Sequence, residues 1–308
     1  MSATRRDILL LSGGTGGAKL ALGIAERFGP GRLSVIANTG DDIEIYGAHV
    51  SPDPDLVSFW LAGLIDERGW GLRGDSFAVM DALRELGEEI WFNLGDRDLA
   101  WCVERATLRG GGLTPTAALA RLNEAIGQAV PVLPMCDEQV RTWVSTPDGG
   151  WCPFQEFMIR RGARGPIDGL EFRGAERARP TPEVLAAIET AETILIGPSN
   201  PLASIAPILA VPGLAEALRR SPAPVLAVSP IVGGEVLKGP TAAFMDFAGL
   251  PCSAAGIREH YGELLDGIVA DEQLEAPPAS LLTATRMDDA AARQQLAEAA
   301  VRFAGELG

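Results

Sequence analysis

The chain has 308 residues, of which 47% are hydrophobic and 22% are charged, so it can bury a core of ordinary size. Its formal net charge is −15 and its pI is near 4.6, which argues against nucleic acid as a partner because an acidic protein repels the phosphate backbone. The apolar run Ile8–Leu11 is too short for a signal segment or a membrane span. The cysteines are widely spread, with no CxxC pair and no zinc-binding spacing. We therefore expect a cytoplasmic protein that inserts in no membrane and has unpaired, buried thiols.

The N-terminal segment has the pattern of a parallel β-α-β unit. Asp7–Leu11 reads as a buried strand, and it leads into a glycine-rich turn, Ser12–Gly17. Ala18–Phe28 then carries apolar residues at helical spacing, and Leu33–Ala37 is a second apolar run. A strand, a turn, a helix and a strand in this order predict the start of a right-handed parallel sheet.

The rest of the chain alternates in the same way, apart from one interruption. Asp137 to about Arg177 is rich in short strand patterns around the turn signal Thr146–Gly150, which predicts an antiparallel insertion. We expect a single domain, 1–308, with an α/β fold: a Rossmann-like, mainly parallel sheet flanked by helices, with this smaller antiparallel insertion at about 137–177. The expected helices are about Leu56–Glu67, Ser76–Leu86, Asp98–Leu108, Pro115–Gln128, Pro182–Ala191, Gly213–Arg220 and Asp288–Phe303, and the expected strands are Val132–Met135, Val140–Ser145, Phe154–Arg160, Leu170–Arg173, Thr193–Ile196 and Val225–Val228.

The glycine-rich turn is a candidate anion-binding site. Glycines let backbone amides approach an anion, and the following helix adds the positive end of its dipole. Ala18 before Lys19 and Leu20 after it break the Walker A pattern, and Lys19 stands where GxGxxG needs its third glycine. A tight structural turn is the alternative. The candidate residues are Gly13, Gly14, Thr15, Gly16, Gly17 and Lys19.

Two acidic clusters follow the second predicted strand. Asn38 opens a turn that contains Asp41 and Asp42, and a Ser-Pro-Asp-Pro-Asp segment then supplies Asp53 and Asp55. Because both clusters follow one strand, they can face one crevice, and several carboxylates beside a phosphate site indicate Mg²⁺. The alternative is an Asp-rich turn followed by a helix cap. Asn38 also stands where a dinucleotide-binding strand would end in an acid, which weakens an assignment to NAD binding.

Three further loops hold polar residues beside predicted strands or helices. Gly95–Leu99 places an arginine between two acids at a helix start. Gly197–Pro201 and Ser229–Gly234 each follow a buried strand, the position at which α/β proteins bind ligands. Taken one at a time, the first loop is equally compatible with a structural role, and for the other two a structural role is favoured.

Taken together, the motifs resemble the 2-phospho-L-lactate transferase (CofD) family of coenzyme F-420 biosynthesis, over about residues 7–272. No single motif is specific, but their ordered combination is. The matching segments are GGTGGAK, NTGDD, SPDPD, GWGLRGD, LGDRDLA, FQEFMIRR, IGPSNP with SIAPIL, and SPIVGG with KGP.

The resemblance implies a transferase whose donor is a guanosine diphosphate ester of a three-carbon acid: 2-phospholactate, phosphoenolpyruvate or 3-phosphoglycerate. The ribityl hydroxyl of the deazaflavin Fo would attack the phosphorus that carries this acid, releasing GMP, with Mg²⁺ on the diphosphate. It further implies that Asp55 and Asp42 bind the metal and act in catalysis with Arg97, and that the protein forms a homodimer. The implied substrate-binding residues are Gly13, Gly14, Thr15, Gly16, Gly17, Lys19, Asn38, Asp55, Asn93, Asp96, Ser199, Asn200, Ser229 and Gly233.

The chain departs from the family pattern at two places. Asn93 stands where the family commonly has a basic residue that contacts the acceptor, and Trp101-Cys102 stands where Thr-His usually follows GDRDLA. Two other functions remain as alternatives. One is a non-catalytic regulator of carbon metabolism that binds nucleotide sugars with the same fold, and the other is an NAD-dependent oxidoreductase, which the broken glycine pattern disfavours.

Overall fold

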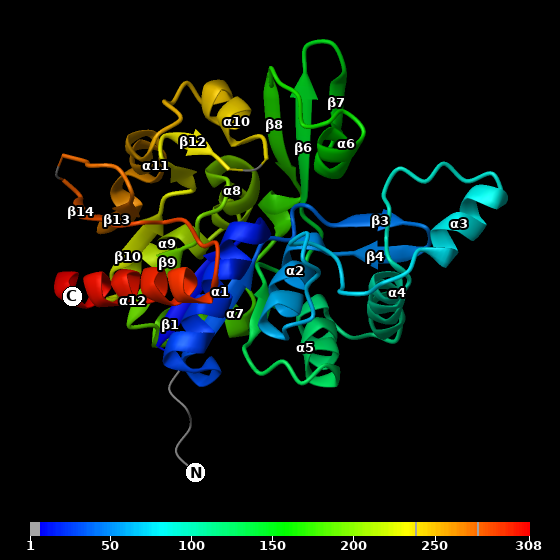
Figure 1. Ribbon diagram of the computed structural model, residues 1–308, viewed down its shortest axis with the longest axis horizontal. Helices are drawn as coiled ribbons and strands as arrows, with labels where there is room; N and C mark the ends of the chain where they lie inside the picture. The colour runs from blue at the N-terminus through cyan, green and yellow to red at the C-terminus, as the bar shows by residue number, and fades with distance from the viewer. Residues whose placement is uncertain (1–6, 238, 276) are drawn as a thin grey trace.

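The computed structural model describes residues 7–237, 239–275 and 277–308 (Figure 1). At its centre is a seven-stranded sheet in the order β14-β13-β10-β9-β1-β2-β5, and every neighbouring pair in it is parallel. The predicted parallel α/β fold is therefore confirmed. The strands are β1 (Ile8–Ser12), β2 (Leu33–Ala37), β5 (Val132–Pro134), β9 (Thr193–Ile196), β10 (Val225–Val228), β13 (Gly267–Ala270) and β14 (Ala279–Leu282).

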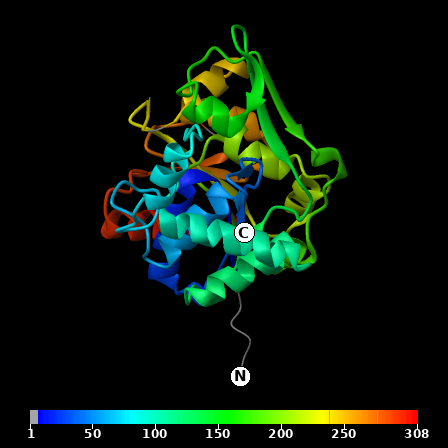
Figure 2. The ribbon, with the colours of Figure 1, turned by 90° about the vertical axis from the view of Figure 1, so that its right-hand side faces the viewer.

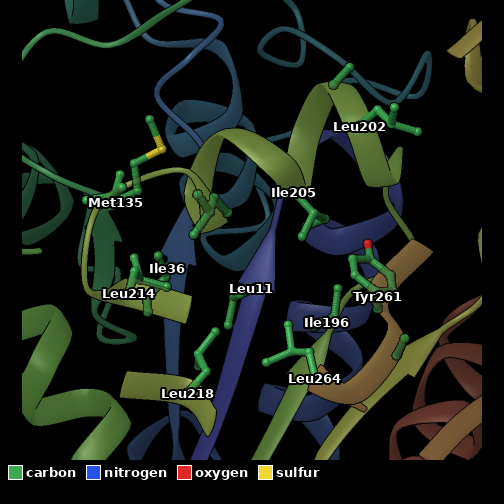
Figure 3. Packing of buried hydrophobic residues seen from close by; sticks show 14 of the residues in the cluster. Leu11, Ile36, Met135, Ile196, Leu202, Ile205, Leu214, Leu218, Tyr261 and Leu264 are labelled. Carbon is green, nitrogen blue, oxygen red and sulfur yellow. The ribbon is translucent and has the colours of Figure 1, made fainter. Parts of the chain in front are cut away.

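Helices cover both faces of the sheet, which explains why most of its strands are continuous apolar runs. Along β1, Leu9 and Leu11 pack into one buried cluster, while Ile8 and Leu10 pack into the other. The first cluster is closed by α7 (Pro182–Thr190), α8 (Ala206–Leu209), α9 (Leu214–Arg220) and α11 (Ala254–Tyr261), and Figure 3 shows it around Leu11, Ile196, Leu214 and Leu218. The second is closed by α1 (Gly14–Phe28), α2 (Pro52–Leu61), α5 (Pro115–Ala125) and α12 (Ala290–Leu307).

The order of the strands reverses at β1. From β1 the chain passes to β2 and then β5 on one side, and later to β9, β10, β13 and β14 on the other. In such a sheet the two loops that leave adjacent strands in opposite directions open a crevice at the carboxyl ends, where ligands bind. Here these loops begin at Gly13, after β1, and at Gly197, after β9.

The antiparallel insertion is also confirmed. Strands β6 (Arg141–Thr146), β7 (Gly150–Pro153) and β8 (Gly169–Arg173) form a separate sheet in the order β7-β6-β8, which stands at the top of the molecule in both views (Figures 1 and 2). The strand expected at Phe154–Arg160 is wrong, because the segment is a helix, α6 (Phe154–Ile159). Phe154 and Phe157 lie one helical turn apart and both pack on Phe244, a contact that no pattern within the segment announces.

The glycine-rich segment also differs from the expectation. Helix α1 begins at Gly14, so most of the glycines form its first turn rather than a loop before it. Helix α2 likewise begins earlier than expected, at Pro52, because proline suits the first turn of a helix, and it ends before Gly63, which has a φ of +68°. Helices α3 (Ala78–Glu85) and α4 (Asp96–Gly110) lie within two residues of their expected bounds.

The sequence analysis did not predict several short elements. They are the hairpin β3 (Ile43–Ile45) and β4 (Ala48–Val50), the hairpin β11 (Ile231–Val232) and β12 (Glu235–Val236), helix α10 (Thr241–Phe247), the π-helical turn η3 (Pro201–Ile205), and the 3-10 turns η1 (Pro30–Arg32), η2 (Ala175–Arg177) and η4 (Gly262–Leu264). Strands β13 and β14 and helix α11 were also not predicted.

All four cysteines are unpaired as expected, although Cys252 is only half-buried. Among the described residues, no single helix has the length and apolar character needed to cross a membrane. One bent pair, Pro201–Leu209 with Leu214–Arg220 at 84°, satisfies both criteria only when its halves are taken together. That residues 1–308 form one domain stays a prediction.

Candidate active site at the carboxyl edge of the sheet

The loops after β1 and β9 are bound to each other at the point where the strand order reverses. The amide of Gly13 donates to Ser199 Oγ at 3.3 Å, and the Ser199 hydroxyl donates to the Gly13 carbonyl. A Cβ on Gly16 would lie 2.0 Å from the Pro198 carbonyl oxygen, so only glycine fits there. The structure thus brings together two segments that the sequence analysis had placed at the site separately.

A carboxylate of the protein occupies the N-terminus of α1. Asp53 accepts hydrogen bonds from the Gly14 amide at 2.7 Å and from Asn38 Nδ2 at 2.9 Å. Burial raises the pKa of Asp53 to about 6, although the bonds from Asn38 and Gly14 oppose the shift. Nearby Asp41 is also buried, and burial together with Asp53 raises the pKa of its carboxyl group. The Gly14 amide at the N-terminus of α1 therefore already bonds a carboxylate of the chain, and binding of a substrate anion at this turn stays a prediction.

Asp55, two residues further along α2, is bound by side chains of α4. Its Oδ1 accepts from the Trp101 indole Nε1 at 2.8 Å and from the Arg105 guanidinium, both on α4. Its Oδ2 is buried and has no hydrogen-bond partner among the described residues. Burial raises the pKa of Asp55 despite the opposing charge of Arg105. The side chain is therefore held by one oxygen and leaves the other available.

Asp42 lies in a hydrogen-bond network that reaches Asp55. Its two oxygens lie 3.0 Å from His49 Nε2 and 2.7 Å from Ser51 Oγ. Arg105 donates to the His49 carbonyl at 3.0 Å and to Asp55, so His49 and Arg105 connect the two predicted metal ligands. Burial lowers the pKa of His49, but its bonds to Asp42 and to Glu44 outweigh this effect and raise it.

A cavity of about 180 Å³ opens beside Asp53 and Asp55. Asp98, on α4, also lines it, and burial together with the charges of Asp55 and Asp75 raises the pKa of Asp98 to about 7. The predicted residue Asn93 lies at the same cavity. Its apolar walls include Leu56, Phe59, Trp70, Leu72, Phe77 and Phe92. The cavity thus combines a group of carboxylates with aromatic walls.

Two other predicted residues hold the helices that flank the cavity. The Asp96 carboxylate accepts from the Ser76 hydroxyl at 2.6 Å and from the amides of Ala78 and Val79, at the N-terminus of α3. These bonds, led by that of Ser76, lower the pKa of Asp96. Arg97 is exposed and donates to the Arg73 carbonyl at 3.2 Å. Neither side chain lines the cavity.

The remaining predicted residues lie near the switch point or beyond it. Asn200 Oδ1 accepts from the amides of Leu202 and Ala203, whereas its buried Nδ2 has no partner among the described residues. Lys19 donates to the Met287 carbonyl at 3.2 Å, before α12.

Ser229 follows β10 and bonds the backbone of Ile231, and the Gly233 amide donates to Asp271 at 2.7 Å. Thr15 faces the loop that contains Gly69, where an added Cβ would lie 3.8 Å from Thr15 Cγ2. Lys238 of the KGP motif lies outside the described residues.

A family model described as 2-phospho-L-lactate transferase CofD matches residues 8–302. The chain belongs to the CofD family. Its curated relatives in this family include a 2-phospho-L-lactate transferase from Methanosarcina mazei, 38% identical over 267 residues that cover 86% of this chain and 87% of the relative. A phosphoenolpyruvate transferase from Streptomyces coelicolor is 39% identical over 270 residues, covering 86% and 85%. The predicted family is therefore confirmed, and the chain is a member of a transferase family.

Solved structures agree on the fold. Two crystal structures of protein BH3568 from Bacillus halodurans, one of which describes it as a member of the UPF0052 family, match with TM-scores of 0.54 and 0.56. They are 20% and 19% identical to this CofD-family chain, covering 89% and 88% of it and 82% of the matched chain in each case. At this identity the likeness concerns the architecture alone.

Three site residues of this CofD-family member were given no role in the sequence analysis, which noted Asp98 only as an acid of the Gly95–Leu99 loop and Trp101 only as a departure from the family pattern. Asp98, Trp101 and Arg105 stand at positions i, i+3 and i+7 of α4, so they share one face of that helix. Trp101 and Arg105 are buried on this face and Asp98 is half-buried there. Two charged residues and an indole at helical spacing are the signal that the sequence contains. The spacing does not show that Asp55 is the partner of Trp101 and Arg105, because Asp55 lies on another helix.

The described residues contain no cluster of three or more histidine, cysteine or acidic side chains arranged to hold a metal ion. Mg²⁺ binding at Asp42 and Asp55 therefore stays a prediction.

Proposed function

We propose that this CofD-family member transfers a phosphorylated three-carbon acid from a guanosine diphosphate ester to the ribityl hydroxyl of the deazaflavin Fo, with release of GMP, in coenzyme F-420 biosynthesis. Support comes from the relatives, which are named 2-phospho-L-lactate and phosphoenolpyruvate transferases. The observation that carries the proposal concerns Asp55, which lies beside a cavity with aromatic walls and whose buried Oδ2 has no partner within residues 7–237, 239–275 and 277–308. Such a cavity suits a flat aromatic acceptor whose hydroxyl must come close to carboxylates.

The donor would lie over the switch point. The first turn of a helix leaves amides without partners inside the helix, and those of Thr15 and Gly16 remain beside the Gly14 amide that Asp53 occupies. The unpartnered Nδ2 of Asn200 is a donor available to the nucleotide from the adjacent loop. We assign the diphosphate to this turn and the guanosine to the loops after β9 and β10, with Ser199 and Ser229.

The acceptor hydroxyl would be activated on the α4 side of the cavity. In the proposed step its oxygen bonds the phosphorus that carries the acid, the bond from that phosphorus to the oxygen of GMP breaks, and the hydroxyl proton passes to Asp98. A carboxyl group with a pKa near 7 suits this role, because it can accept a proton near neutrality. Positioning and charge stabilisation then supply most of the rate enhancement.

The residues fit a bound Mg²⁺ in one respect. Mg²⁺ takes one or two carboxylates and completes its shell with phosphate oxygens and water, and Asp55 Oδ2 is a free carboxylate oxygen beside the cavity. We assign Asp55 as the principal ligand, since both oxygens of Asp42 already have partners. When bound, the ion would neutralise charge on the diphosphate. We also propose, from the family resemblance, that the enzyme acts in the cytoplasm as a homodimer.

The test is a mass-spectrometric assay of the purified chain with Mg²⁺ and Fo, supplied in turn with the guanosine diphosphate ester of each of the three acids. We expect a new Fo adduct and GMP from one donor, and a loss of roughly 10³-fold or more in Asp55→Asn because it removes the charge that faces the cavity. If no donor yields an adduct while a UDP-sugar binds, the protein is the regulator rather than the transferase. Turnover by Asp55→Asn at the wild-type rate would remove Asp55 from the site.

A further inference from the structure

We propose that Trp101 is a positioning residue: its indole N–H holds Asp55 Oδ1 so that Oδ2 stays directed at the cavity. This inference rests on the proposed function of Asp55. The contact is the 2.8 Å hydrogen bond from Trp101 Nε1, and it is buried on both sides. Trp101 itself does not line the cavity, so it would not touch either substrate.

Trp101 prevents a bidentate ion pair between Asp55 and Arg105. Arginine and a carboxylate tend to pair through two parallel hydrogen bonds, which occupy both oxygens. Here Arg105 reaches Asp55 only through Nη2 and Oδ1, while its Nη1 donates to the His49 carbonyl at 3.0 Å. With Oδ1 bound by Trp101 as well, the carboxylate cannot rotate toward Arg105 without breaking a buried hydrogen bond.

The indole ring is itself fixed in place. Trp101 is 9% exposed and packs edge-on against Phe59 of α2, with ring centroids 5.1 Å apart and planes at 66°. Since Phe59 and Asp55 share α2 and lie four residues apart, the ring and the N–H of Trp101 contact neighbouring turns of one helix. The packing of the ring and the hydrogen bond can therefore be separated by substitution.

Trp101→Phe removes the N–H while it keeps an aromatic ring against Phe59. A matched control is available in Trp60 of α2, whose indole N–H is buried but has no hydrogen-bond partner among the described residues. Trp60→Phe makes the same chemical change without loss of a hydrogen bond. Both variants keep Asp55 and Arg105.

The first measurement is steady-state turnover of both variants. We expect Trp101→Phe to lower kcat about tenfold, as for the loss of one hydrogen bond to a charged group, with KM for both substrates changed less than about twofold. Trp60→Phe should keep the kcat of the wild type. Equal kcat values in the two variants would overturn the proposal, and so would a Trp101→Phe variant that changes only KM.

The second measurement needs no turnover. In a ¹H–¹⁵N spectrum of the full chain, the Trp101 indole resonance, assigned from its loss in Trp101→Phe, should shift in Asp55→Asn while the Trp60 indole resonance does not. An unmoved Trp101 resonance would show that the contact is absent and would overturn the proposal. If the resonance shifts but the wild type transfers no acid from any donor, the positioning contact stands and the proposed reaction fails.

Discussion

Asp53 and Asp55 lie two residues apart at the start of α2, yet they face differently built regions. Asp53 faces the switch point, where two neutral donors, the Gly14 amide and Asn38, satisfy its two oxygens. Asp55 faces α4, where a cation and an indole share one oxygen, and the other oxygen has no partner in the described part of the chain. Both side chains are almost fully buried, at 5% and 4% exposed, so burial does not distinguish them. This unequal treatment of the two oxygens is the reason why the proposed function assigns the metal to Asp55 rather than to Asp53.

The two regions also differ in how charge is compensated. No described cation bonds Asp53, and its high pKa is the consequence of burial opposed only by neutral donors. Asp55 has a buried arginine beside it, and removal of one member of such a pair leaves the other charge without compensation. Substitutions on the α4 side should therefore have larger effects on stability than substitutions of exposed groups around it.

The largest expected effect follows Arg105→Met, which leaves Asp55 buried without its cation. We expect the free energy of unfolding to fall by about 3–5 kcal/mol, the range found when one member of a buried ion pair is removed. Chemical denaturation of the purified variant measures the change. Restoration of most of the loss in the double variant Asp55→Asn/Arg105→Met would attribute it to the uncompensated charge.

Two other results would contradict this distinction between the surroundings of Asp53 and those of Asp55. If Arg105→Met unfolds at the denaturant concentration of the wild type, Asp55 is neutral in the folded protein and the two regions are alike. If the double variant is as unstable as the single one, the loss comes from the packing of the long arginine side chain rather than from its charge.

The sequence predicted the central sheet because its strands carry their own signal. β1, β2, β9 and β10 are apolar runs with polar or glycine residues at their carboxyl ends, and the helices between them have apolar residues at helical spacing. β14 is only half-buried at its first three residues and exposed at its last, so it lacks the continuous apolar pattern. The prediction of a strand in place of α6 was wrong because the signal lies outside the segment. The two buried phenylalanines of α6 owe their burial to Phe244, about ninety positions later in the chain.

The site residues that directly follow strands of the central sheet could be predicted from the sequence. Asn38 follows β2 and Ser199 follows β9, the two strands that flank β1 in the parallel sheet, and both residues lie at the switch point. Residues whose role depends on packing between helices were not predictable in this way. Trp101 and Arg105 act through Asp55 only because α4 lies against β4 and α2, and nothing within α4 states which acid it will meet.

The next prediction concerns Asp98 of α4, whose expected effect on the free energy of unfolding is smaller. Its pKa rises from an ordinary value of 3.8 to about 7 on folding, so between these values the folded chain holds a proton that the unfolded chain has lost. The free energy of unfolding should then decrease as pH rises through this window and stop changing above it. In Asp98→Asn this contribution is absent, and between pH 5 and pH 8 the wild type should lose up to about 3 kcal/mol more than the variant.

Thermal or denaturant unfolding at both pH values measures this difference. Asp148→Asn, at the exposed turn between β6 and β7, serves as the control for the removal of one surface carboxylate. An Asp98→Asn variant with the pH dependence of the wild type would mean that Asp98 is ionised throughout. Asp98 would then be too weak a base for the role of proton acceptor proposed here.

The smallest expected effect concerns Asp96, which lies two residues from Asp98 on α4 but faces away from the cavity. Its carboxylate already accepts three hydrogen bonds, from the Ser76 hydroxyl and the first amides of α3. Asp75 in turn accepts from the amides of Arg97 and Asp98, so α3 and α4 stabilise each other's N-termini. We expect Asp96→Ala to lower Tm by only about 1–2 °C, because the lost bonds act as an exposed helix cap.

The same variant decides between the two roles assigned to Asp96. The family resemblance implies that Asp96 binds substrate, whereas the structure gives its carboxylate three partners within the chain. If it acts only as a cap, Asp96→Ala should bind Fo with the affinity of the wild type in a fluorescence titration, and Asp96→Asn should recover part of the Tm because an amide oxygen still accepts. A large loss of Fo affinity at unchanged Tm would return Asp96 to the acceptor site, and the functional region would then extend from Asp55 across the first turn of α4.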